Sequence, residues 1–181
     1  MTTCMSDDYW HGAAVGCDAG LAPWLRDCGS LTQRIRERCE LFTVRPVRSG
    51  LARIAFDESA LLGLAPHRLA WSREVFLYAD GQPVVFAHSA CAPQHLRGAW
   101  GAVRGLGNKP LGELLFSHPL VVRRPLHYKA LHAHHPLYRS AVPGDAPERL
   151  WARRSLFTLH GAPLLVTEVF LPAILRLDNA R

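Results

Sequence analysis

The alternation of apolar and polar residues predicts several strands, and the pattern is clearest near the end of the chain. Residues 161–172, GAPLLVTEVFLP, contain a turn glycine, an alternating run and a closing proline. Successive strand side chains point to opposite faces, so Glu168 shares a face with Val166 and Phe170. Both faces are apolar, and a buried carboxylate loses much hydration. Glu168 is therefore a candidate functional residue, unless it forms an ordinary buried ion pair or reaches water at a strand end.

A hairpin is predicted for residues 69–91, because Asp80-Gly81 is a favoured two-residue turn. Counting outward from this turn places Arg73 opposite His88 on an otherwise apolar face. Two basic side chains that face each other on paired strands repel when both are charged, so this arrangement would favour an anion bound between them. The alternative is a neutral, hydrogen-bonded His88, which the ordinary histidine pKa of about 6.5 allows.

Other segments predict further strands joined by short helices. The expected helices lie at about 22–28, 30–39, 93–100 and 111–116, and residues 57–64 are expected to form a short helix or a loop. The expected strands are two within 41–56, joined by a turn at Ser49-Gly50, one at 121–128 and one at 150–160. Counting outward from a turn at Gly161-Ala162 places Ser155 opposite Glu168, where its hydroxyl would hydrogen-bond the carboxylate.

Composition indicates one compact domain and gives little support to a nucleic-acid partner. The chain has 181 residues, of which 49% are hydrophobic, and a net charge of +6 with a pI near 9.4. The arginines are scattered and do not alternate with stacking aromatic residues, so we expect no nucleic-acid partner. A basic surface would still attract a small dianion.

The cysteines and the apolar runs indicate a reduced, cytoplasmic protein. The five cysteines are odd in number and show no paired metal-ligand spacing: Cys4, Cys17, Cys28, Cys39 and Cys91. The first residues do not resemble a signal peptide, and Glu168 interrupts the longest apolar run. We therefore expect a cytoplasmic protein without stable membrane insertion.

A histidine-rich segment is the one candidate metal site. His132 and His134 would point to the same side of an extended chain, and His135 follows directly. No nearby cysteine or acid completes a ligand set, so we expect no metal at this segment.

Three segments resemble the bacterial chorismate pyruvate-lyase family in residues, order and spacing. They are residues 73–83, 106–112 and 153–172. The resemblance extends over about residues 21–173. Members of this family convert chorismate to 4-hydroxybenzoate and pyruvate at the start of ubiquinone synthesis. The resemblance therefore implies a carbon–oxygen lyase that needs no cofactor.

The family's binding residues transfer to five positions of this chain. The resemblance implies that Arg73 binds the substrate carboxylate, that the backbones of Leu31 and Leu111 also bind it, and that Glu168 contacts the ring hydroxyl. His88 stands where the family usually has a second arginine. Because imidazole cannot form a bidentate fork and is only partly charged near neutral pH, weaker anion binding is expected.

We expect an α+β fold in which a mostly antiparallel sheet carries short helices over one face and encloses a ligand pocket. The domain would cover residues 21–175, between a poorly ordered lead-in at 1–20 and a tail at 176–181. The segment 129–149 is longer than in the family, which leaves its role as a lid open. A monomer is expected.

Two alternative functions remain. One is a non-catalytic domain that binds a small aromatic carboxylate, because the lyase fold resembles effector-binding domains of bacterial regulators. The other is a lyase or isomerase that acts on a related chorismate-like acid.

Overall fold

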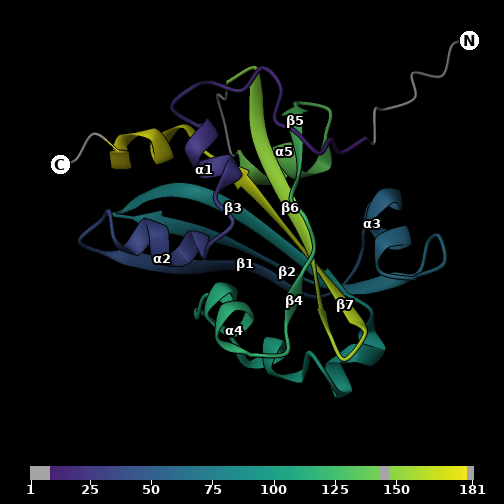
Figure 1. Ribbon diagram of the computed structural model, residues 1–181. Coiled ribbons are helices and arrows are strands. Elements are labelled where there is room, and N and C mark those ends of the chain that lie inside the picture. The colour runs from purple at the N-terminus through teal and green to yellow at the C-terminus, as the bar shows by residue number, and fades with distance from the viewer. Residues whose placement is uncertain (1–8, 143–146, 179–181) are drawn as a thin grey trace, which may run out of the picture.

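The computed structural model describes residues 9–142 and 147–178. Seven strands form one antiparallel sheet in the order β1-β2-β3-β7-β6-β4, and β5 pairs with the same edge of β6 as β4 (Figure 1). The strands are β1 (Phe42–Arg53), β2 (Leu69–Ala79), β3 (Gln82–Cys91), β4 (Val122–Arg123), β5 (His127–His132), β6 (Arg149–Leu159) and β7 (Ala162–Phe170). The short helices between them are α1 (Ala22–Arg26), α2 (Leu31–Arg36), α3 (Phe56–Leu61), α4 (Leu111–Ser117) and α5 (Pro136–Ala141), with 3₁₀ turns at η1 (Pro93–Arg97), η2 (Gly101–Gly105) and η3 (Pro172–Asp178).

Helices cover both faces of the sheet. In Figure 1, α1 and α2 lie above α4 on the face toward the viewer. Trp24 and Leu25 of α1 and Ile35 of α2 are fully buried in the core on this side. On the other face, Leu62 beside α3 packs with Ala90 of β3, and α5 packs against the same strand. The predicted α+β class with an antiparallel sheet is confirmed, and the structure adds a second covered face.

The β2–β3 hairpin contains a bulge that changes the predicted pairing. Tyr78 pairs with Pro83, but Leu77 pairs with Val85, so β3 has one extra residue. Pro83 has no amide hydrogen to donate to a regular ladder at this point. A shift of one residue exchanges the two faces of a strand. The prediction that Arg73 faces His88 was therefore wrong.

The β6–β7 turn also differs from the predicted one. Its two central residues are His160 and Gly161, and both have positive φ, as a tight hairpin turn requires. The predicted turn at Gly161-Ala162 lay one residue too late, which displaced the pairing by two. As a result, Arg153 pairs with Glu168, and Ser155 pairs with Val166.

The first strand is continuous where the sequence suggested two strands. Ser49 and Gly50 pair with β2 instead of forming a turn, and the only irregularity in this ladder lies between Pro46 and Arg48. A bulge at this point therefore accounts for the interrupted alternation of apolar and polar residues, and no turn at Ser49-Gly50 is needed to explain it.

The expected lead-in at 1–20 and the expected tail at 176–181 are each described only in part. Residues 1–8 of the expected lead-in and 179–181 of the expected tail lie outside the described residues. His11, however, exchanges backbone hydrogen bonds of 2.9 and 2.8 Å with Tyr128, and Ala14 is buried. The segment predicted as a possible lid contains the end of β5, α5 and the start of β6. Within the described part of the chain, no helix is long and apolar enough to cross a bilayer.

Candidate active site

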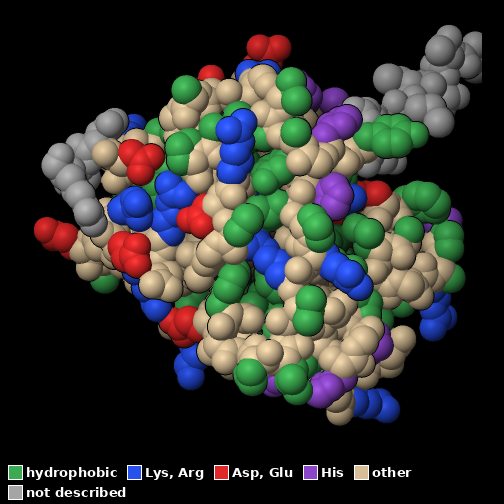
Figure 2. Space-filling view, viewed as in Figure 1, with side chains coloured by type: hydrophobic (Ala, Val, Ile, Leu, Met, Phe, Trp, Pro, Cys, Tyr) green, Lys and Arg blue, Asp and Glu red, His purple; other side chains and the backbone are tan. Residues whose placement is uncertain are grey.

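A cavity lies between the sheet and the helices α2 and α4. Its charged side chains come from four strands: Arg73 of β2, Arg123 of β4, Arg153 of β6 and Glu168 of β7. Most of the remaining lining is apolar: Leu31, Val75, Leu77, Ala87, Leu111, Leu115, Phe116, Phe157 and Val166. Figure 2 shows basic side chains among hydrophobic ones at the centre of this face.

The charges around the cavity do not cancel. The lining contains three guanidinium groups and one carboxylate, so 3 − 1 leaves a net charge of +2. Since an apolar surrounding screens charge weakly, this excess favours an anionic occupant.

Arg73 is a buried cation that has no carboxylate partner among residues 9–142 and 147–178. It is 4% exposed, and its Nη2 donates to the carbonyl oxygens of Gly107 and Lys109, both at 2.9 Å. Burial lowers the pKa of Arg73 from its ordinary value. The segment 106–112 thus holds the guanidinium in place by carbonyl groups alone, and the charge remains available to an anion.

Glu168 is held by Arg153 from the neighbouring strand. Arg153 Nε donates to Glu168 Oε2 at 2.6 Å, and the arginine side chain is 1% exposed. Arg153 Nη1 also donates to the carbonyls of Trp24, Leu25 and Asp27 at the end of α1. No hydrogen bond to another described residue occupies Glu168 Oε1. One carboxylate oxygen is therefore fixed and the other can meet a ligand.

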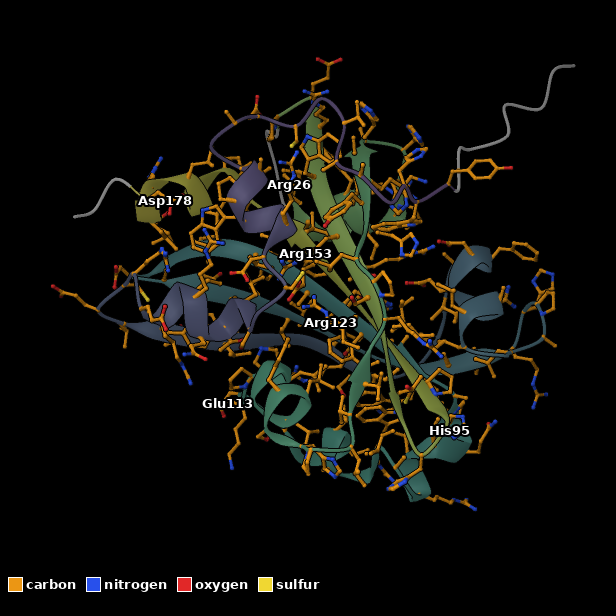
Figure 3. All side chains as sticks on the ribbon, in the orientation of Figure 1. Arg26, His95, Glu113, Arg123, Arg153 and Asp178 are labelled. Carbon is orange, nitrogen blue, oxygen red and sulfur yellow. The ribbon has the colours of Figure 1, made fainter. Side chains whose placement is uncertain are left out.

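Arg123 adds a third guanidinium from the short strand β4. Its Nε donates to Ser155 Oγ at 2.9 Å, and its Nη1 donates to the Cys28 carbonyl at 2.8 Å. Burial lowers the pKa of Arg123, and the charge of Arg153 acts in the same direction, while Glu168 opposes both. In Figure 3, Arg123 and Arg153 lie near the centre of the molecule, between α1 and α4.

The starts of α2 and α4 close the cavity. Ser30 caps α2 by accepting from the Gln33 amide at 3.3 Å, and Pro110 precedes the first residue of α4. Leu31 and Leu111 therefore line the cavity at positions where backbone amides have no partner within their own helix. The structure brings both residues predicted from the family to the same cavity as Arg73 and Glu168.

His88 does not line this cavity. The bulge turns it to the opposite face, where it is buried with Nδ1 3.2 Å from Glu74 Oε1 and Nε2 3.4 Å from Glu58 Oε1. Its predicted place beside Arg73 is taken by Ser89. The assignment of His88 to substrate binding is therefore corrected, because counting along the strands assumed a regular ladder.

The histidine-rich segment forms no metal cluster. The rings of His132 and His134 stack with their centroids 6.1 Å apart. Throughout the described ranges, no group of three histidine, cysteine or acidic side chains could hold a metal ion.

Sequence reasoning missed two cavity residues, Arg153 and Arg123. The available signal for Arg153 was the His160-Gly161 pair, because a turn there places Arg153 opposite Glu168. Arg123 had no such signal, since β4 has only two residues and its position depends on the break at Pro125.

Two solved structures share this fold at low sequence identity. The C-terminal domain of PhnF has a TM-score of 0.55 at 14% identity, covering 72% of this chain and 82% of that domain. The ligand-binding domain of a GntR-family regulator from Bordetella bronchiseptica has a TM-score of 0.52 at 15% identity, covering 73% and 85%. At these identities the likeness shows the fold. Fold and cavity together define an α+β domain with a cavity lined by three arginines and one glutamate.

The sequence comparisons identify the family. The chorismate lyase family matches residues 16–178. A probable chorismate pyruvate-lyase of Nitrosospira multiformis is 52% identical over 171 residues, covering 93% of this chain and 95% of that protein. A second, from Aromatoleum aromaticum, is 53% identical over 165 residues, covering 89% of each chain. The chain belongs to the chorismate lyase family.

Proposed function

We propose that this cavity binds chorismate with the ring carboxylate at Arg73 and the ring hydroxyl at Glu168. As a chorismate pyruvate-lyase, the chain cleaves the enolpyruvyl ether to give 4-hydroxybenzoate and pyruvate for the ubiquinone pathway. The observation that carries the residue assignment is the buried Arg73, which lacks a carboxylate partner in the described part of the chain, on the same sheet face as Glu168.

The spacing of the two residues suits a para-substituted ring. Arg73 pairs with Ser89, which pairs with Val166, two residues before Glu168. With strands about 4.8 Å apart and a rise of about 3.4 Å per residue, the two Cα atoms are roughly 12 Å apart. Both side chains line the same cavity, and this separation would accommodate a six-membered ring with a carboxylate at one end and a hydroxyl at the other.

The reaction requires no group outside the substrate to accept electrons. The ether bond at ring carbon C3 breaks, and the hydrogen at C4 moves to the enolpyruvyl methylene carbon. The methylene becomes the methyl group of pyruvate, the ether oxygen becomes its keto oxygen, and the ring becomes aromatic with its hydroxyl retained. We expect orientation and electrostatic stabilisation to supply most of the rate enhancement, without a metal or other cofactor.

The backbones of Leu31 and Leu111 would assist Arg73 at the carboxylate. Each lies at the start of a short helix, where free amides favour a negative group. With α2 and α4 over the ring, water would be excluded from the hydrogen transfer.

Turnover by purified protein tests this proposal. The wild-type chain should form 4-hydroxybenzoate and pyruvate in equal amounts, and a chelator should leave the rate unchanged. Arg73→Gln and Glu168→Gln should each lower kcat/KM by about 100-fold or more, because each removes a charge that would contact the ring substituents. Arg53→Gln, an exposed arginine on β1, is the charge-matched control.

Failure of this test would take a clear form. Wild-type rates in the Arg73 variant would remove that residue from the site. Unequal product amounts would contradict the reaction itself, and turnover of another chorismate-like acid in preference to chorismate would redirect the substrate assignment.

Location and assembly remain expectations. The four described cysteines, Cys17, Cys28, Cys39 and Cys91, are free thiols, which agrees with a reducing compartment. We therefore propose that the enzyme acts in the cytoplasm and as a monomer.

A further inference from the structure

The cavity has more positive charge than one carboxylate needs. Arg73 and the helix-start amides suffice for the ring carboxylate, and Glu168 offsets one further guanidinium. One guanidinium charge then remains uncompensated when a monoanion such as 4-hydroxybenzoate is bound. Chorismate has a second carboxylate on its enolpyruvyl group, so the substrate balances the net charge of +2 and the aromatic product does not.

Arg153 has a buried donor group that the protein leaves unused. Its Nε and Nη1 are occupied by Glu168 and by three backbone carbonyls, but its Nη2 is buried and has no hydrogen-bond partner among the described residues. An unsatisfied buried donor of a charged group is costly, so such a group indicates a missing partner.

Arg123 presents a second guanidinium close to the first. Its Nε and Nη1 hold Ser155 and the Cys28 carbonyl, which fixes the plane of the group, and its remaining Nη2 donates to no described residue. It also lies 5.4 Å from the ring centroid of Phe157 and 5.6 Å from that of Phe116. Its charge is close enough to those of Arg153 and Glu168 for each to shift its pKa.

The connectivity of chorismate places its second carboxylate at this end of the cavity. The enolpyruvyl ether is attached to the ring carbon next to the one that bears the hydroxyl. If the hydroxyl meets Glu168, the side-chain carboxylate must lie near Glu168 as well, and therefore near its partner Arg153. Arg73 binds the opposite end of the ring.

We propose that Arg153 and Arg123 form a second carboxylate subsite that binds the enolpyruvyl carboxylate and so separates the dianionic substrate from the monoanionic aromatic product. The subsite rests on the proposed orientation of chorismate between Arg73 and Glu168. After the ether is cleaved, the second carboxylate leaves with pyruvate, and the aromatic product keeps no contact with these two arginines.

A comparison of substrate and product affinity tests the subsite. In Arg123→Gln, the KM for chorismate should rise about 10- to 100-fold, the range expected for one lost hydrogen-bonded charge contact. The inhibition constant of 4-hydroxybenzoate, measured in the same assay, should change less than about threefold. Arg123→Lys keeps the charge without the planar fork and should recover part of the loss.

Arg124→Gln is the matched control, because Arg124 is the next residue, is exposed and does not line the cavity. Arg153→Lys provides a second variant, with folding checked by circular dichroism because Arg153 also binds three carbonyls.

An unchanged KM in Arg123→Gln, or an equal loss of affinity for chorismate and 4-hydroxybenzoate, would overturn the subsite. Those outcomes leave the lyase reaction standing as long as wild-type protein forms both products, whereas an inactive wild type would refute the proposed function first.

Discussion

His88 is a buried histidine between two buried acids. Burial alone would lower the pKa of His88, but the hydrogen bond with Glu74 and the charges of Glu58 and Glu74 outweigh it, so its pKa is raised. Arg48, which also pairs with Glu74, opposes this shift. The pKa of Glu74 is lowered, first by its hydrogen bond with His88. These four side chains, Arg48, Glu58, Glu74 and His88, form the His88 cluster. It connects β1, β2, β3 and α3 on the sheet face opposite the cavity.

The His88 cluster predicts a pH-dependent stability. A raised folded-state pKa gives a stabilisation that is complete below the unfolded pKa of about 6.5 and is lost as the pH rises through the folded value. His88→Gln should lower the free energy of unfolding by about 1–3 kcal/mol at pH 6 and by less at pH 9. Urea unfolding at both values measures the difference, with the exposed His127→Gln as control. A loss that grows with pH would contradict a raised pKa.

The helices α2 and α4 meet over the cavity at Gly112, where little space is left for a side chain. A Cβ on Gly112 would lie 3.0 Å from Thr32 Oγ1 and 3.4 Å from Ser30 Oγ. An ion pair between Arg36 and Glu113 also joins the two helices, but both side chains are about half exposed, so it contributes little. The close approach of Gly112 to Ser30 and Thr32 therefore contributes to how tightly α4 packs against α2 above the cavity.

Gly112→Ala should loosen the packing of α2 against α4 over the cavity and so speed the release of 4-hydroxybenzoate. The added methyl group must push Thr32 away by a few tenths of an ångström, so the dissociation rate of 4-hydroxybenzoate should rise about 3- to 10-fold, as for a lost contact of about 1 kcal/mol. Stopped-flow displacement measures this rate. Adding Thr32→Ala should restore slow release by making room, while Gly105→Ala, where a Cβ meets no atom within 4 Å, serves as control. An unchanged dissociation rate in Gly112→Ala would show that the packing of α2 against α4 does not limit the release of 4-hydroxybenzoate.

At the scale of the whole molecule, the long edge strand β1 decides whether copies associate. An exposed edge of 12 residues could pair with a second chain, but β1 contains Pro46, a bulge and the exposed Arg45, Arg48 and Arg53. Charged residues, proline and bulges all disfavour edge-to-edge pairing, and the net charge of +6 adds repulsion between copies.

We therefore predict a monomer of 20.1 kDa at protein concentrations up to about 100 μM. Sedimentation velocity at low and high salt provides the measurement. A dimer at moderate concentration would show that this edge, or another surface, pairs despite its charge. Dimers that appear only at high salt would instead indicate that electrostatic repulsion, more than the shape of the edge, keeps copies apart.

Local pattern was sufficient for most elements and for the two principal site residues. The alternation around Glu168 and the Asp80-Gly81 turn predicted the strands β7, β2 and β3, because a period of two and positive-φ turn residues are properties of the chain itself. The polar residues Arg73 and Glu168 were conspicuous because they interrupt apolar strand faces. The placement of Leu31 and Leu111 at the cavity came from the family resemblance.

The tertiary structure alone decided which charged residues meet. The bulge between Pro83 and Val85 moved His88 to the opposite face, and the turn at His160-Gly161 paired Arg153 with Glu168. Arg123 reaches the cavity only because β4 joins the edge of β6. Register depends on hydrogen bonding between strands far apart in sequence, and an error of one residue exchanges the faces of a strand. The sequence thus determined the strands and the charged residues on their apolar faces, and the packed sheet determined the partners of those residues.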